Sequence, residues 1–255
     1  MRIRVRTCGP CRAQGAMNTT WNSVLDCLTS PDPGGKTICV DQDDMDFLEG
    51  LGPATFSFLN EMYLLSSRTF ALAIHVWKKF IAVRYHVGKP RMGQVQLLKT
   101  GLPNVSCACY VLCCKFVETH IPRIEDVAAF FGDNVTATAI RHHELQILQD
   151  VGWDVNITTA VDVLHAIMTC APPCLQALSQ RAELYVNVGY CDTTLSNFPL
   201  PVIAVGSLLA ASCDEFNTVA RVDSPYLRFV PEHLITAECV LWCNSLRNWM
   251  RRCGR

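Results

Sequence analysis

The strongest constraint on the fold comes from residues 105–117, which are apolar nearly all the way round a helix. In a globular protein such a helix must be covered on every side by neighbouring elements. We therefore expect residues 105–117 to form the central helix of a helical bundle. Lys115 is the one charged residue between positions 100 and 117, and its ammonium group is costly to bury without a partner.

Most of the chain after residue 54 also has the periodicity of amphipathic helices. Ser66 and Ser67 precede apolar residues from Phe70 to Ile81 with i, i+3, i+4, i+7 and i+11 spacing, which predicts a capped helix with one buried stripe. Similar patterns predict helices near 124–131, 136–151, 158–168, 175–188, 201–213 and 232–251. Because no segment alternates as a strand does, we predict an all-α protein.

A weak internal repeat suggests how these helices are divided. Residues 108–115 resemble residues 206–213, and each segment is a helix rich in small side chains. Two tandem bundles, each built around one such helix, explain the repeat. We predict a first bundle over residues 54–156 and a second over 157–255. Residues 1–53, basic at first and then rich in Pro and Gly, are expected to be a largely flexible leader and linker.

Composition excludes several classes of protein. The 255 residues carry a net charge of −1, so general attraction to phosphate does not organise the chain. The longest apolar stretch, Leu200–Cys213, is too short to span a bilayer. Fifteen cysteines without a secretory signal predict reduced thiols in the cytosol or nucleus.

Catalytic and metal-binding motifs are also missing from the sequence. Cys8-Gly-Pro-Cys11 has the spelling of a thioredoxin motif, but no strand precedes it. No Cys/His group has metal-ligand spacing. We therefore expect no enzyme activity, no metal and no cofactor.

Glu144 is a second charged residue at an unusual place. It lies on the apolar stripe of its predicted helix, four residues from both Ile140 and Leu148. A buried carboxylate needs a partner, and two interpretations follow. In the first, structural interpretation, Lys115 and Glu144 pair with each other, or each reaches the surface separately. In the second, functional interpretation, they lie side by side at the rim of an apolar patch and bind a partner's backbone.

The segments around these two charges resemble the cyclin family. Residues 108–118, followed by Pro122, are similar to the central cyclin-box helix, which ends Ala-Ser-Lys-Phe-Glu-Glu before a proline. Residues 144–154 resemble the family's Glu-x-x-Ile-Leu-x-x-Leu-x-Phe/Trp-Asp, and Glu144 follows Lys115 by the 29 residues usual in cyclin boxes. Residues 73–80 resemble an earlier helix, although Lys78 replaces the usual aspartate.

This resemblance implies a fold, a partner and a set of contact residues. The fold would be two tandem five-helix cyclin boxes, the second diverged, and the partner a cyclin-dependent kinase. Lys115 and Glu144 would hydrogen-bond backbone groups beside the kinase's regulatory helix. The apolar contacts around them would come from Leu112, Phe116, Leu148 and Trp153.

Some segments depart from cell-cycle cyclins. Residues 47–55 lack the Arg and Trp of the substrate-docking patch, and about a dozen extra residues separate Phe80 from Val105. This insertion, Val105-Ser-Cys107 and residues 205–212 look more like the divergent cyclin N-terminal domain-containing proteins of meiotic crossover formation. A herpesvirus-type cyclin is the rival within the family.

The resemblance to meiotic proteins implies a nuclear, chromosome-associated protein, with recombination proteins as further partners. We expect no membrane and no direct nucleic-acid contact. The alternative function is a helical scaffold or adaptor in chromatin or transcription complexes that activates no kinase.

Overall fold

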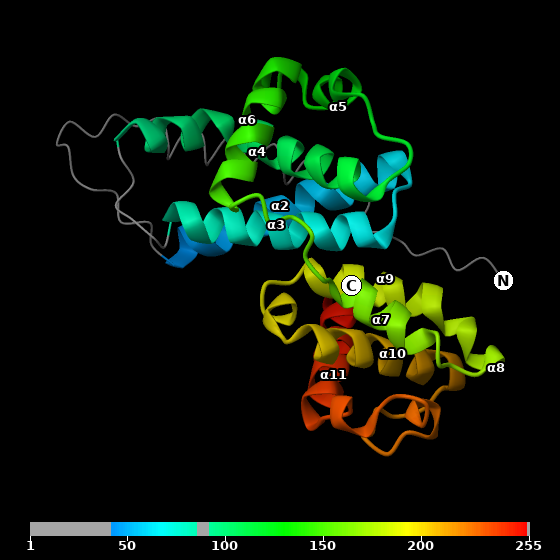
Figure 1. Ribbon diagram of the computed structural model, residues 1–255. Coiled ribbons are helices and arrows are strands. Elements are labelled where there is room, and N and C mark those ends of the chain that lie inside the picture. Colours follow the sequence, from blue (N-terminus) through cyan, green and yellow to red (C-terminus); the bar gives the residue numbers. More distant parts are fainter. Residues whose placement is uncertain (1–41, 86–91, 254–255) are drawn as a thin grey trace.

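The computed structural model describes residues 42–85 and 92–253, which form two helical bundles, one above the other in Figure 1. The first contains α2 (Gln42–Tyr63), α3 (Ser67–Tyr85), α4 (Met92–Val117), α5 (Ile124–Phe130) and α6 (Ala137–Asp150). The second contains α7 (Ala160–Met168), α8 (Pro173–Gln176), α9 (Leu178–Tyr190), α10 (Leu200–Phe216) and α11 (Ala237–Cys253). Short 3-10 turns are η1 (Gly132–Asn134), η2 (Leu195–Asn197), η3 (Pro225–Leu227) and η4 (Glu232–Leu234). No described residue lies in a strand, so the all-α, two-bundle prediction is confirmed.

The central helix of the first bundle is α4, as its apolar sequence predicted. Nearly every residue from Leu102 to Cys114 is buried, and Tyr110 stacks on Phe56 of α2 with ring centroids 5.8 Å apart. The helix begins at Met92 rather than at the predicted Val105, and Pro103 lies inside it instead of before its start. An interior proline removes one backbone hydrogen bond, which the long helix tolerates here.

The flexible linker expected up to residue 53 is wrong from Gln42 onward, where α2 begins. Three of the Gly and Pro residues that suggested a linker, Gly50, Gly52 and Pro53, lie within this helix. Gly52 lies so close to the indole of Trp77 that a Cβ would come within 2.5 Å of the ring. A small residue there lets α2 and α3 approach each other closely. The Cys8–Cys11 motif and the rest of the leader lie outside the described residues.

In the second bundle, α10 is the central helix. Every residue from Val202 to Cys213 is buried, and the helix packs against both α9 and α11. Two glycines make room for the indole of Trp242: a Cβ added at Gly189 or Gly206 would come within 2.5 Å or 2.7 Å of that ring. The helix predicted from residue 232 begins instead at Ala237, because residues 232–234 form η4.

Replacing Gly189 by alanine is expected to destabilise the fold by about 1–3 kcal/mol, because Trp242 is fully buried and cannot move away from the new methyl group. Gly50→Ala is the matched control: it is also helical, and nothing lies within 4 Å of the added Cβ. That change should leave stability equal or raise it by about 1 kcal/mol. Chemical denaturation of both variants measures the difference, and equal midpoints would contradict the packing argument.

Candidate partner-binding face

Lys115 and Glu144 form an ion pair between the last turn of α4 and the middle of α6. The Lys115 Nζ donates to Glu144 Oε1 at 2.6 Å and to Oε2 at 2.8 Å. The Lys115 side chain is 40% exposed and that of Glu144 is 11% exposed. The pair therefore lies at the edge of the first bundle, with the ammonium open to solvent and the carboxylate largely covered.

The four apolar residues expected around this pair are exposed to different extents. Phe116 and Trp153 are 54% and 63% exposed, whereas Leu148 is partly buried and Leu112 is almost fully buried. Phe116 and Trp153 therefore present apolar surface, while Leu112 lies in the core. Leu145, which the sequence argument missed, is 50% exposed. The sequence pattern that could have indicated Leu145 is its position as an apolar residue outside the buried stripe of its helix.

Trp153 is held in place by the turn that ends α6. The backbone N–H of Trp153 donates to the carbonyl of Leu148 at 2.8 Å, and that of Gly152 to Gln149 at 3.2 Å. This pair of bonds is the Schellman helix end, in which Gly152, with φ of 69°, occupies the left-handed position usual for glycine. Trp153 is itself left-handed, with φ of 61°, a conformation that costs a non-glycine residue roughly 1–2 kcal/mol. The turn thus presents a large indole at the surface despite backbone strain.

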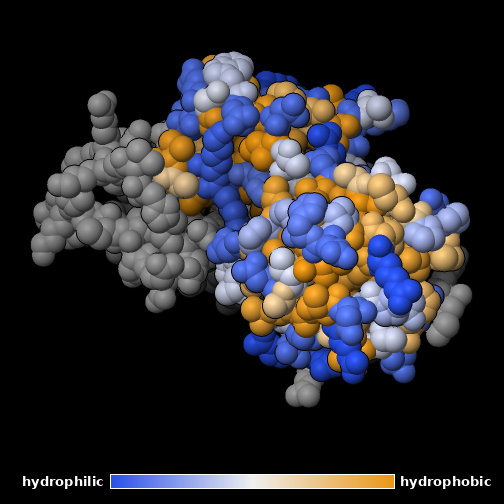
Figure 2. Space-filling model, turned by 60° about the horizontal axis from the view of Figure 1, so that its bottom comes forward, coloured by the Kyte–Doolittle hydropathy of each residue, from blue (hydrophilic) through white to orange (hydrophobic). Residues whose placement is uncertain are grey.

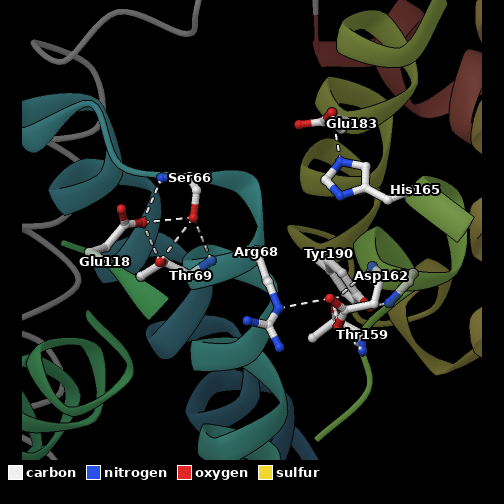
Figure 3. Close-up of polar contacts among 10 residues, drawn as sticks. Ser66, Arg68, Thr69, Glu118, Thr159, Asp162, His165, Glu183 and Tyr190 are labelled. Atoms are coloured by element: carbon white, nitrogen blue, oxygen red, sulfur yellow. Dashed lines mark hydrogen bonds and ion pairs between the residues drawn. The ribbon is translucent and has the colours of Figure 1, made fainter. Parts of the chain in front are cut away.

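Glu118 fixes the end of α4, three residues after Lys115. Its Oε1 accepts hydrogen bonds from the Ser66 N–H at 2.8 Å, from the Ser66 hydroxyl at 2.7 Å and from the Thr69 hydroxyl (Figure 3). Burial raises the pKa of Glu118, but these hydrogen bonds outweigh it and hold the pKa below its ordinary value. The carboxylate thereby joins the turn that carries Lys115 and Phe116 to the start of α3.

The second bundle is attached to α3, through polar contacts. Arg68 donates to Asp162 of α7 at 2.7 Å (Figure 3), and His75 Nε2 lies 3.0 Å from the hydroxyl of Tyr190 in α9. Lys78, which replaces the aspartate usual in the family, donates to the Ser196 hydroxyl at 2.8 Å. The candidate face on α4 and α6 is thus separate from these contacts between the bundles.

Exposed apolar side chains also occur on the second bundle, and Figure 2 shows orange surface there beside charged residues. The large ones are Leu184, Phe216, Val219, Val222 and Leu241. Apolar exposure therefore does not single out one face of the protein. What distinguishes the face on α4 and α6 is the Lys115–Glu144 ion pair, next in the chain to the exposed Phe116.

The described residues contain no sign of a metal site or a disulfide. Their eleven cysteines all carry free thiols, and in residues 42–85 and 92–253 no three His, Cys, Asp or Glu side chains are grouped to hold a metal ion. Nor does any helix in this part of the chain have the length and apolarity that crossing a membrane requires.

Comparison with known proteins identifies the family. Residues 57–156 match the family described as "Cyclin, N-terminal domain". The matched segment is therefore a cyclin box. The matched segment runs from α2 to just beyond α6 and contains both Lys115 and Glu144.

Individual cyclins are similar over much of the chain. It is 24% identical to mouse (Mus musculus) G1/S-specific cyclin-D2 over 189 residues, covering 71% of this chain and 62% of that protein. It is 23% identical to the G2/mitotic-specific cyclin-A of Hydra viridissima over 154 residues, covering 60% of this chain and 33% of that protein. The chain thus spans less than two thirds of the length of either relative.

Solved structures show that the cyclin fold extends into the second bundle. A viral cyclin from herpesvirus saimiri superposes with a TM-score of 0.65 and 14% identity, covering 92% of this chain and 97% of that one. A chain in the CAK complex from Chaetomium thermophilum gives a TM-score of 0.52, also at 14% identity, covering 97% of this chain and 78% of that one. Since the family match ends at residue 156, the second cyclin box keeps the fold while its sequence has diverged.

Proposed function

We propose that this protein is a cyclin-type regulatory subunit that binds a cyclin-dependent kinase through the face around Lys115 and Glu144. The observation that carries the proposal is the ion pair, exposed at Lys115, at the two positions that resemble the kinase-binding lysine and glutamate of cyclin boxes. Phe116, the next residue after Lys115, and Trp153, just beyond α6, are exposed as well. The family match and the relatives named as G1/S-specific and mitotic cyclins support a regulatory role rather than a catalytic one.

The ion pair can serve a partner because its two groups have hydrogen-bonding capacity to share. The ammonium of Lys115 has three donors, and each carboxylate oxygen of Glu144 accepts more than one hydrogen bond. A kinase backbone carbonyl would add to Lys115 and a backbone N–H to Glu144. Binding there would act by shifting the kinase toward the conformation in which its regulatory helix is in the active position.

Within the family, we propose a role in meiotic crossover formation, with nuclear, chromosome-associated localisation and recombination proteins as further partners. The support is the sequence resemblance at the insertion before Val105 and at residues 205–212. A viral cyclin remains the rival, and the superposition on the herpesvirus saimiri protein is a likeness of fold at 14% identity.

The test of kinase binding is affinity capture of the tagged full chain from nuclear extract, with co-purifying proteins identified by mass spectrometry. We expect a cyclin-dependent kinase in the captured fraction, and phosphorylation of a test substrate that depends on adding the chain. Capture of recombination or basal transcription factors without a kinase would contradict the proposal. That result would favour the alternative, a chromatin or transcription adaptor. If the adaptor contacted DNA, binding to duplex DNA would fall steeply with salt.

A further inference from the structure

The second bundle contains a surface hollow of about 450 Å³ between α11 and the turn that leads into η2. The α11 wall is formed by Ser245, Asn248, Trp249 and Arg252. These residues have i, i+3, i+4 and i+7 spacing, which places them on one face of the helix. The buried face of the same helix is a different stripe, formed by Cys239, Trp242, Cys243 and Leu246.

The polar groups on the α11 wall are available to a ligand. Among the described residues, the side chains of Ser245, Asn248, Trp249 and Arg252 have no recorded hydrogen-bond or ion-pair partner, in contrast to Arg247, whose Nη2 lies 3.2 Å from Asp214 Oδ1. The four side chains supply a hydroxyl, an amide, an indole N–H and a guanidinium. All four can donate a hydrogen bond to an acceptor, and the guanidinium also adds a positive charge.

The opposite wall contains the carboxylate of Asp192, and one of its two oxygens is already engaged. Asp192 Oδ1 accepts hydrogen bonds from the backbone N–H of Thr194 at 2.9 Å, from that of Leu195 at 3.0 Å, and from the Thr194 hydroxyl. These three donors belong to the turn itself. The free groups on the α11 wall are therefore mainly donors, with one cation at Arg252, so this wall complements a ligand that is rich in acceptors and places an anionic group at Arg252, away from Asp192.

We propose that this hollow binds an acidic peptide segment of a partner protein. Arg252 pairs with a carboxylate or phosphate of the peptide, Asn248 and Ser245 hydrogen-bond its backbone, and Trp249 packs against a neighbouring apolar side chain. One guanidinium beside an apolar indole suits a short peptide better than DNA, which binds through many phosphate contacts. The site goes beyond the proposed kinase binding, because it lies on α11, in the bundle opposite α4 and α6 (Figure 1).

The test uses fluorescence anisotropy with the full chain and a labelled peptide of alternating glutamate and leucine. The same peptide with glutamine in place of glutamate, a phosphoserine version and a duplex DNA are the comparison probes. We expect the glutamate and phosphoserine peptides to bind and the glutamine peptide and DNA to bind at least tenfold more weakly. The phosphoserine arm shows which anionic group the site prefers. Tighter binding of DNA, or equal binding of the glutamine peptide, would overturn the proposal.

Two neighbouring arginines provide a matched pair of variants. Arg252→Ala removes a charge that lines the hollow, whereas Arg251→Ala removes the same charge one residue earlier, from an exposed side chain that does not line it. We expect Arg252→Ala to weaken peptide binding by about tenfold, the size of a charged hydrogen bond, and Arg251→Ala by less than twofold. Equal losses would mean general attraction to charge and would overturn the site. Kinase capture should be unchanged in both variants, so this test fails or succeeds independently of the proposed function.

Discussion

Lys115→Ala is expected to weaken kinase capture by about 2–4 kcal/mol, roughly thirtyfold or more, because it removes a charged contact that becomes desolvated at the interface. Glu144→Ala should have an effect of the same size. Both changes also break an internal ion pair, so some loss of fold stability is expected as well. Since Lys115 is 40% exposed, that loss should stay below the roughly 3–5 kcal/mol that accompanies breaking a fully buried pair. Pull-downs and thermal melts on the same preparations measure the two effects.

Exchanging the two charges separates binding from stability. The double variant Lys115→Glu/Glu144→Lys can rebuild the ion pair within the chain but presents the opposite charges to a partner. We expect its melting temperature to recover toward that of the original protein while kinase capture stays lost. Arg141→Ala, which breaks the exposed pair of Arg141 with Glu125, is the control and should leave both unchanged. If the exchanged pair captured the kinase normally, Lys115 and Glu144 would have only an internal role.

Acidification is expected to destabilise the protein through His75. Burial, followed by the nearby charge of Lys78, lowers the pKa of this imidazole from 6.5 to about 4. Below pH 6.5 the unfolded chain binds a proton at His75 that the folded chain does not, so the free energy of unfolding falls. The loss begins near pH 6.5, is nearly complete at pH 4, and amounts to about 3 kcal/mol.

The His75→Gln variant isolates this effect from the titration of carboxylates. Glutamine can still hydrogen-bond the hydroxyl of Tyr190 but takes up no proton. We expect chemical denaturation between pH 7 and pH 4 to show a smaller loss for His75→Gln than for the original chain. Parallel curves for the two proteins would show that His75 titrates normally in the folded state.

Local signals in the sequence located most of the helices, because they depend on residues close together in the chain. Thr136 caps α6 by accepting a hydrogen bond from the Ala139 N–H at 3.2 Å, and Thr159 forms a capping box with Asp162 at the start of α7. The apolar character of α4 correctly indicated the centre of the first bundle. Such caps and stripes need no knowledge of the tertiary structure.

The features that the sequence argument missed depend on contacts between distant residues. Gly52 looked like part of a linker because the approach of Trp77, 25 residues later in the chain, cannot be read from its neighbours. The network from Glu118 to Ser66 joins residues 52 positions apart. Leu112 was expected at the surface with Phe116, but only the packing of the bundle shows that it is buried.

Helix α3 packs in the core of the first bundle and also contacts α7 and α9 of the second. Dividing the protein near residue 156 is therefore expected to disturb both bundles. A fragment ending there would lose Asp162, Tyr190 and Ser196, and with them these hydrogen bonds of Arg68, His75 and Lys78. The imidazole would regain an ordinary titration, and the helix that supports α4 would lose its neighbours on one side. The second cyclin box, despite its diverged sequence, therefore helps to stabilise the first by packing against α3.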